Sequence, residues 1–306
     1  MVSITKRLGI LAVVLASASA CASGEPAANS AAGAGSGAFV YAPALNKPFR
    51  ETMTRYEEVS IPGSPMRDAQ KWTMDFDVTT TQENNLFKRS HRLVGLKINV
   101  NGAELLKGDE VKADLATVEV LTDKDANVVD VRGADQLSDA IAHLGAPETQ
   151  SLLKRVFSPQ RLKALIIIRN LEQHSDFVGR PAQVGSQWQA TEADSGVVTQ
   201  IRIAGETPCD GAKCVQVQRT YELDRQAVFA EVSERIAAFV QSQGGDPSKV
   251  QLTGMDLKLE DSLVIDPTTM DYHGARFSQD ATLHVTGPNG ELPVAFKVVR
   301  ERTYKF

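Results

Sequence analysis

Between residues 71 and 81 the sequence KWTMDFDVTTT alternates apolar and polar side chains. Trp72, Met74, Phe76 and Val78 fall on one side of an extended chain, while threonines and aspartates fall on the other. A period of two is typical of an antiparallel strand with one face on a core and the other in water. This stretch therefore requires a sheet with one buried face, and it excludes a purely helical fold.

The same pattern recurs along the chain. HRLVGLKINVNG places Val94, Leu96, Ile98 and Val100 on one face, and Asn101-Gly102 then supplies a tight turn. TDKDANVVD has no glycine at the sixth position of a calcium loop, so we interpret it as a turn between two strands. Further strands are predicted over residues 187–191, 197–204, 213–223 and 250–306, the last stretch with a hairpin at Asn289-Gly290 and with Val294, Phe296 and Val298 on one side.

Helices are predicted in two places between the strands. Residues 134–177 suit helices that are interrupted near Pro147 and Pro159, since proline is tolerated in a first turn. Residues 224–243 suit one longer helix with an apolar stripe. At helical spacing that stripe consists of Val228, Phe229, Val232, Ile236, Phe239 and Val240. Antiparallel strands with helices grouped between them predict an α+β fold.

The amino terminus has the layout of an export signal. Lys6 and Arg7 precede the apolar run LGILAVVL, and Ala18-Ser19-Ala20 supplies small residues for cleavage. The apolar run is shorter than the roughly 20 residues that a membrane-spanning helix needs. We therefore predict a signal peptide over residues 1–20.

Cys21 follows the predicted cleavage site, and two fates remain open for it. The residues Ser19, Ala20 and Cys21 resemble the end of a bacterial lipobox, although Ala18 stands where leucine is usual. The first alternative is acylation of Cys21, with residues 21–37 as a flexible tether to the membrane. Ala22 resembles the outer-membrane sorting pattern, so the protein would then face the periplasm. The other alternative is a soluble periplasmic or secreted protein.

Two further cysteines, Cys209 and Cys214, lie close together in PCDGAKC between two predicted strands. We predict that they form a disulfide that closes a hairpin, which leaves Cys21 as the odd cysteine. A redox pair would more often be spaced C-x-x-C, and a metal site would need ligands that are not nearby in sequence.

Charge and motifs exclude several functions. Removal of residues 1–20 leaves a net charge of −7, so no basic surface for nucleic acid is expected. The five histidines have no metal-ligand spacing, and neither H-E-x-x-H nor G-x-S-x-G occurs. We accordingly predict no catalytic residues, no metal and no cofactor, and we treat residues 38–306 as a single α+β domain. A hydrolase site formed only by the fold stays an alternative.

An exported, lipid-tethered β-rich domain with inserted helices resembles the LolA/LolB type of envelope protein. The resemblance rests on the lipobox residues and the architecture. It implies a mostly antiparallel, curved sheet, an incomplete barrel with helices on its concave side, and a lipid or other apolar ligand. Under this hypothesis the helix at 224–243 covers a cavity lined by Trp72, Met74, Phe76, Leu96, Ile98, Val228, Phe229, Val232, Ile236 and Phe239. The alternative is an assembly partner that holds another envelope protein through a surface patch.

Overall fold

The structure is a computed structural model, and it describes residues 37–62, 67–107, 117–160, 162–163, 176–191, 198–222, 225–242, 246–287 and 290–306. The predicted signal peptide, Cys21 and all but the last residue of the predicted tether lie outside these residues. The described strands are β1 (Phe49–Ser60), β2 (Arg67–Glu83), β3 (Leu86–Val100), β4 (Ala103–Leu106), β5 (Thr117–Thr122), β6 (Val128–Arg132), β7 (Gln187–Thr191), β8 (Val198–Cys209), β9 (Ala212–Glu222), β10 (Gln251–Ile265), β11 (Tyr272–Gly287) and β12 (Gly290–Lys305). The helices are α2 (Ala134–Ala142), α3 (Pro147–Val156), α5 (Arg225–Ser242) and the short 3-10 helix η3 (Pro247–Lys249).

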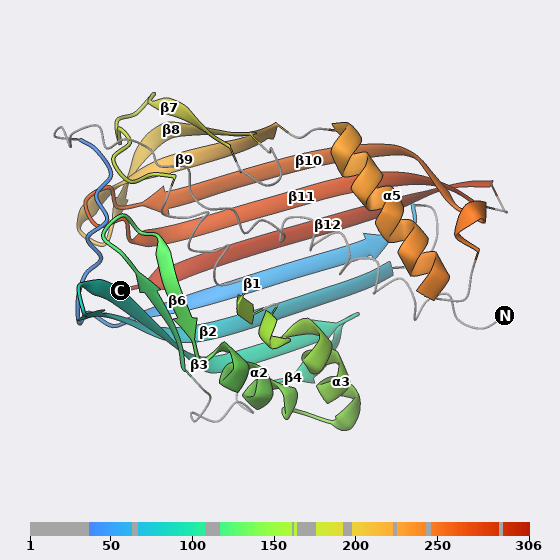
Figure 1. Cartoon of the computed structure of the whole chain (residues 1–306), viewed down its shortest axis with the longest axis horizontal. Coiled ribbons are helices and arrows are strands. Elements are labelled where there is room, and N and C mark those ends of the chain that lie inside the picture. Colours follow the sequence, from blue (N-terminus) through green and yellow to red (C-terminus); the bar gives the residue numbers. More distant parts are fainter. Residues whose placement is uncertain are drawn as a thin grey trace.

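The described strands form a single 12-stranded antiparallel sheet that curves without closing (Figure 1). Its order is β6-β5-β3-β2-β1-β12-β11-β10-β9-β8-β7, with β4 paired to β3. The first and last strands, β1 and β12, pair with each other in the middle of the sheet over Arg50–Ser60 and Ala295–Lys305. This arrangement confirms the predicted α+β fold with a mostly antiparallel, incompletely closed sheet.

The two faces of the sheet differ as the period-two pattern predicts. We call the face that carries the helices the inner face and the opposite face the outer face. The outer face is polar, and charges alternate across neighbouring strands: Glu58 lies opposite Lys297, which lies opposite Asp280. Opposite charges in directly paired positions favour this register, and the row suits a surface in contact with water.

The helices divide the inner face into separate packed regions (Figure 1). α2 and α3 cover β2 and β3 through a cluster that includes Leu137, Leu153 and Phe157. α5 covers β10, β11 and β12 through Val232 and Ile236. A third cluster lies where β8, β9 and β10 meet the amino-terminal segment, and there the rings of Phe39, Phe177 and Trp188 contact one another edge to face.

One residue of the predicted alternation is wrong. The pairing of β2 with β3 contains a bulge between Asp75 and Phe76, so that Leu93 rather than Val94 lies opposite Phe76 and is buried. Gly95 sits at this irregularity, where a Cβ atom would come within 3.0 Å of a carboxylate oxygen of Asp75. A bulge shifts the parity of a strand, which simple alternation cannot anticipate.

The predicted turn at Asp123 and the predicted helix starts agree with the described residues, whereas residues 176 and 177, predicted as the end of a helical stretch, form a turn. In the turn between β5 and β6, the Asp123 carboxylate accepts hydrogen bonds from the backbone N–H groups of Asp125 and Asn127, both at 2.9 Å. α3 begins at Pro147, and α5 occupies all but the ends of the predicted 224–243 helix. The predicted helical stretch over residues 164–175 lies outside the described residues.

Candidate ligand-binding site

The site begins with a gap in the cover of β10. On the inner face of this strand Leu252, Asp261 and Leu263 are buried, with at most 7% of their surface exposed. Between them, Met255 and Leu257 are only half-buried, and so is Leu259. Large apolar side chains on the covered face of a strand are normally buried when the core above them is full. Their partial exposure shows that α5 does not fill the space above this part of β10.

A cavity of about 610 Å³ lies at this place. Its lining includes Val228 and Phe229 from the first turns of α5, the three half-buried β10 residues, and Phe296 of β12. Outer-face positions of the same strands also contribute, among them Asp256, Lys258, Asp280 and Lys297, so half of the lining residues are polar or charged. The volume falls within the range of small-molecule pockets.

The sequence of α5 explains which part of the helix packs against the sheet. Val232 and Ile236 are four residues apart, on one face of the helix, and both are buried against Leu283 and Phe296. Val228 continues this stripe by one turn toward the amino terminus but is only half-buried. The helix is therefore anchored by its middle, while its first turns form one wall of the cavity.

The sheet opens beside the cavity. β9 pairs with β10 only from Val215 to Arg219, opposite Ile265 to Asp261. Within the described residues, the remainder of β10, residues 251–260, has β11 as its sole strand partner. This edge carries the exposed side chains of Lys258 and Glu260 and a register shift at Gly254, which are features that discourage pairing with another strand. This part of β10 is therefore a sheet edge within the described residues.

A charged strip crosses the inner face next to the cavity. Glu51 and Glu57 of β1 are 0% and 4% exposed, and Arg219 and Asp261 are 7% exposed. Arg219 donates to Asp261 at 2.6 Å, and Arg55 pairs with Glu57. Since Asp261 follows Leu259 on the same face of β10, the cavity and the charged strip adjoin.

Burial raises the pKa of Tyr272, which lies near this strip. The Tyr272 side chain lies among aromatic and aliphatic groups, with the ring of Tyr304 at 6.4 Å between centroids. Desolvation raises the pKa of Tyr272 well above its usual value, and the nearby Arg219 and Arg89 charges do not offset it. The hydroxyl is therefore protonated at neutral pH and acts as a neutral polar group on the inner face.

The structure divides the predicted lining into two groups. Trp72, Met74, Phe76, Leu96 and Ile98 are all at most 8% exposed, and they pack under α2 and α3. Val228, Phe229, Val232 and Ile236 belong to the separate cluster of α5. The Phe239 side chain lies outside what the structure describes.

The predicted placement of the 224–243 helix over the Trp72 strand face is therefore wrong. The physical reason is that two shorter helices, α2 and α3, follow directly after the edge strand β6. They therefore cover the neighbouring strands β2 and β3. Val228 and Phe229 do line a cavity, but its floor is β10, which the sequence did not single out.

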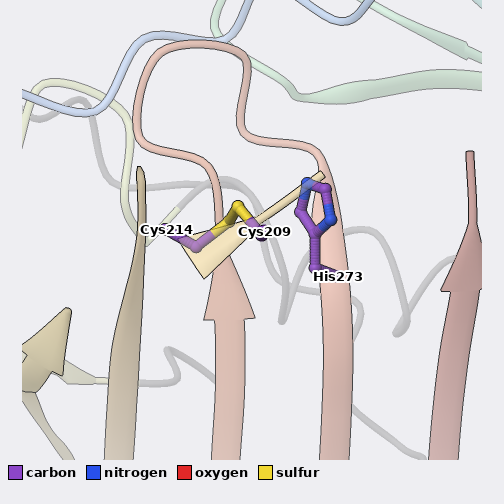
Figure 2. Close-up of side chains that lie close together, drawn as sticks. All are labelled: Cys209, Cys214 and His273. Atoms are coloured by element: carbon purple, nitrogen blue, oxygen red, sulfur yellow. A yellow bond between two sulfur atoms is a disulfide. The ribbon is translucent and has the colours of Figure 1, made fainter. Parts of the chain in front are cut away.

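The predicted disulfide is present. Cys209 and Cys214 close the hairpin of β8 and β9, and His273 of β11 lies beside them (Figure 2). The three potential ligand atoms are within 4.8 Å of one another. A disulfide sulfur is not a thiolate, however, so the oxidised pair offers no metal ligand. The His273 ring lies 4.5 Å from the Phe306 ring between centroids, and its Nδ1 is hydrogen-bonded to Asp210 at 3.1 Å.

Comparisons with known proteins leave the family open. No family model matches the chain, and no curated protein does. None of the described helices is long and apolar enough to cross a membrane.

Among solved structures, the chain is similar to a lipovitellin structure described by its lipid–protein interactions, with 10% identity, a TM-score of 0.45 and 86% of this chain covered. The chain spans only 25% of the length of that protein. A β-barrel-like protein of a domain of unknown function (DUF1849) from Brucella abortus has 12% identity and a TM-score of 0.18 over 87% of this chain and 99% of its own. A DUF1329 family protein from Desulfovibrio piger has 8% identity and a TM-score of 0.16 over 84% and 85%. These low scores carry no functional argument.

The sequence did not reveal the charged strip. Glu51, Arg55 and Glu57 interrupt the apolar residues Phe49, Met53 and Val59 on the inner face of β1, so the alternation of this strand is broken. A polar residue at an inner position looks like a solvent-exposed residue in one dimension. The available signal was the shared parity of Phe49, Met53 and Val59.

Proposed function

We propose that this protein is a non-catalytic carrier that holds an apolar chain, such as the acyl chain of a lipid, between α5 and the inner face of the sheet. The observation that carries the proposal is the cavity above the half-buried residues Met255, Leu257 and Leu259. An apolar ligand in this space would remove these side chains from water and contribute about 25 cal/mol for each Å² of apolar surface buried. The separation of β9 from β10 supplies its entrance.

Binding of 1-N-phenylnaphthylamine, an uncharged probe that fluoresces in apolar surroundings, tests this proposal. We expect saturable binding to the purified protein and weaker binding to Leu257→Trp, because the larger ring takes up part of the cavity above β10. Glu260→Trp is the matched control: it adds a ring on the same strand but on the outer face, and it should bind the probe as the wild type does. Equal binding by all three proteins, or none by the wild type, contradicts the proposal.

Export and membrane attachment complete the proposal and rest on the sequence. We infer cleavage before Cys21 and acylation of that cysteine, which would place the carrier at the bacterial outer membrane facing the periplasm. More than one acyl chain makes such an anchor durable. The mass of the mature protein made in its own host tests this inference: an acyl increment that Cys21→Ser abolishes supports it, and an unmodified Cys21 contradicts it and leaves a soluble periplasmic or secreted protein.

The alternative function, an assembly partner that acts through a surface patch, is tested by the same preparation. Nothing in the described part of the chain favours it over the carrier. Stoichiometric recovery of another envelope protein, together with an empty cavity, would support it.

A further inference from the structure

Three arginines lie together on the inner face, further along β1 and β12 than the cavity. They are Arg55 of β1 and Arg300 and Arg302 of β12, and we call them the arginine cluster. Arg55 lies directly opposite Arg300 in the pairing of β1 with β12, and Arg302 lies opposite the adjacent Met53. Arg55 and Arg302 are therefore diagonal neighbours, about 7–8 Å apart. Like charges directly opposite one another weaken a sheet, so this arrangement needs compensation.

Two N–H groups of the cluster are buried without a hydrogen-bond acceptor among the described residues: Nε of Arg55 and Nη1 of Arg302. Part of the compensation is visible, because Glu57 pairs with Arg55 and the Arg55 guanidinium lies 5.1 Å from the centre of the Trp72 ring. The Arg300 guanidinium lies 5.2 Å from the centre of the Phe277 ring. Aromatic faces attract cations but accept no conventional N–H bonds, so the two buried donors still need an oxygen acceptor.

Two carboxylates of β1 lie beside the cluster. Glu51 and Glu57 are the acidic inner-face residues of β1, and Glu51 lies 3.6 Å from His91. Among the described residues, no carboxylate reaches the buried Nη1 of Arg302. A guanidinium recognises carboxylate and phosphate oxygens through paired, charge-assisted hydrogen bonds.

The arginine cluster and the cavity lie along the same face of β12. Phe296, which lines the cavity, and Arg300 are on the same face of β12 and four residues apart, a distance of about 13 Å along an extended strand. The buried Val298 lies between them. An amphipathic molecule could therefore place its chain beneath α5 and its polar end at the arginines.

We propose that the arginine cluster binds the anionic headgroup, a phosphate or a carboxylate, of the molecule whose chain occupies the cavity. This inference rests on the proposed carrier function and adds the charge of the ligand to it. It predicts that a single-chain anion binds more tightly than an uncharged or cationic molecule of the same chain length.

Displacement of 1-N-phenylnaphthylamine by dodecyl phosphate, dodecanol and dodecyltrimethylammonium, each below its micellar concentration, tests the inference. For the wild type we expect dodecyl phosphate to bind about tenfold more tightly than dodecanol, and the cation to bind most weakly. Inorganic phosphate should displace no probe. Displacement by inorganic phosphate would assign the cluster to free anions and overturn the headgroup inference.

The variant Arg302→Met keeps an unbranched apolar chain and removes the donors. It should lose about tenfold in affinity for dodecyl phosphate and bind dodecanol as the wild type does. The control is Arg276→Met, an exposed arginine on the outer face of β11 that pairs with Glu301. It should change neither affinity.

The outcomes separate the two proposals. Equal affinities for dodecyl phosphate and dodecanol in the wild type overturn the headgroup inference and leave the carrier function in place. Failure of all three amphiphiles to displace the probe overturns both. The wild-type comparison decides the question even if Arg302→Met does not fold.

Discussion

Asp261 collects three hydrogen bonds on the inner face. It accepts from Nε and Nη2 of Arg219 at 3.0 and 2.6 Å and from the Tyr221 hydroxyl at 2.5 Å. Both members of the ion pair are buried. A buried pair of this kind contributes little compared with a well-packed apolar pair, but the loss of one partner strands the other charge away from water.

Asp261→Asn should therefore lower the free energy of unfolding by about 3–5 kcal/mol. Urea unfolding followed by circular dichroism measures it. Asp280→Asn is the matched control, since Asp280 pairs with Lys297 at 3.8 Å on the exposed outer face, and its effect should stay within about 0.5 kcal/mol. If the two variants are equally stable, Arg219 does not depend on Asp261.

Asp77, on the outer face, makes the stability of the folded state depend on pH. Partial burial acts to raise the pKa of Asp77, but hydrogen bonds from Arg92 and Arg50 outweigh it, and the pKa lies below its usual value of 3.8. These bonds measure 2.7 Å each. A carboxylate with a lowered pKa stabilises the folded state fully above its unfolded pKa, and it loses that contribution as the pH falls through the folded value.

The difference in stability between the wild type and Asp77→Asn should consequently be largest near pH 7 and should shrink below about pH 4. Urea unfolding of both proteins at pH 7 and pH 3 measures this difference. A difference that is the same at both pH values would show that the two arginines do not depend on the charge of Asp77.

At the scale of elements, α5 is held by a small number of buried side chains in its middle. Ile236 is 7% exposed and packs against the β11–β12 part of the sheet. Ile236→Ala should lower the free energy of unfolding by about 2–5 kcal/mol, because it leaves a void that the helix cannot close. Glu234→Ala, at an exposed position of the same helix, should change it by less than about 0.5 kcal/mol. Equal effects would mean that α5 does not rest on the sheet as described.

The hairpin of β8 and β9 is closed by its disulfide. Replacement of both Cys209 and Cys214 by alanine should cost about 2 kcal/mol, since the bridge closes a short loop and restricts the unfolded chain. Chemical denaturation of the double variant, with the reduced wild type beside it, measures this cost. No loss of stability in either protein would mean that the turn is held by its strands alone.

The sequence predicted elements better than their assembly. Residues such as Met74, Phe296 and Val298 lie on the face that alternation assigned to them, because burial of one face of a strand enforces a period of two. The parity failed at the Asp75–Phe76 bulge, and β1 escaped notice because its inner face carries Glu51, Arg55 and Glu57. Which helix covers which strands depends on tertiary contacts that periodicity does not contain.

At the scale of the whole molecule, the pairing of β1 with β12 joins two strand runs into one open sheet. The polar outer face meets water, and the inner face is packed under α2 and α3 at one end. Beneath α5, where β9 leaves β10, the cover is incomplete. An open sheet with a partly covered inner face can admit a long apolar molecule from its side, which a closed and packed core cannot.

The most direct test is photolabelling with an uncharged, diazirine-bearing fatty alcohol, followed by peptide mass spectrometry. We predict that the label attaches to the first turns of α5 around Val228 and Phe229 and to the Met255–Leu259 part of β10, and that excess dodecanol prevents it. Label confined to the outer face, or label that dodecanol does not compete away, would contradict the claim that this cavity carries an apolar chain.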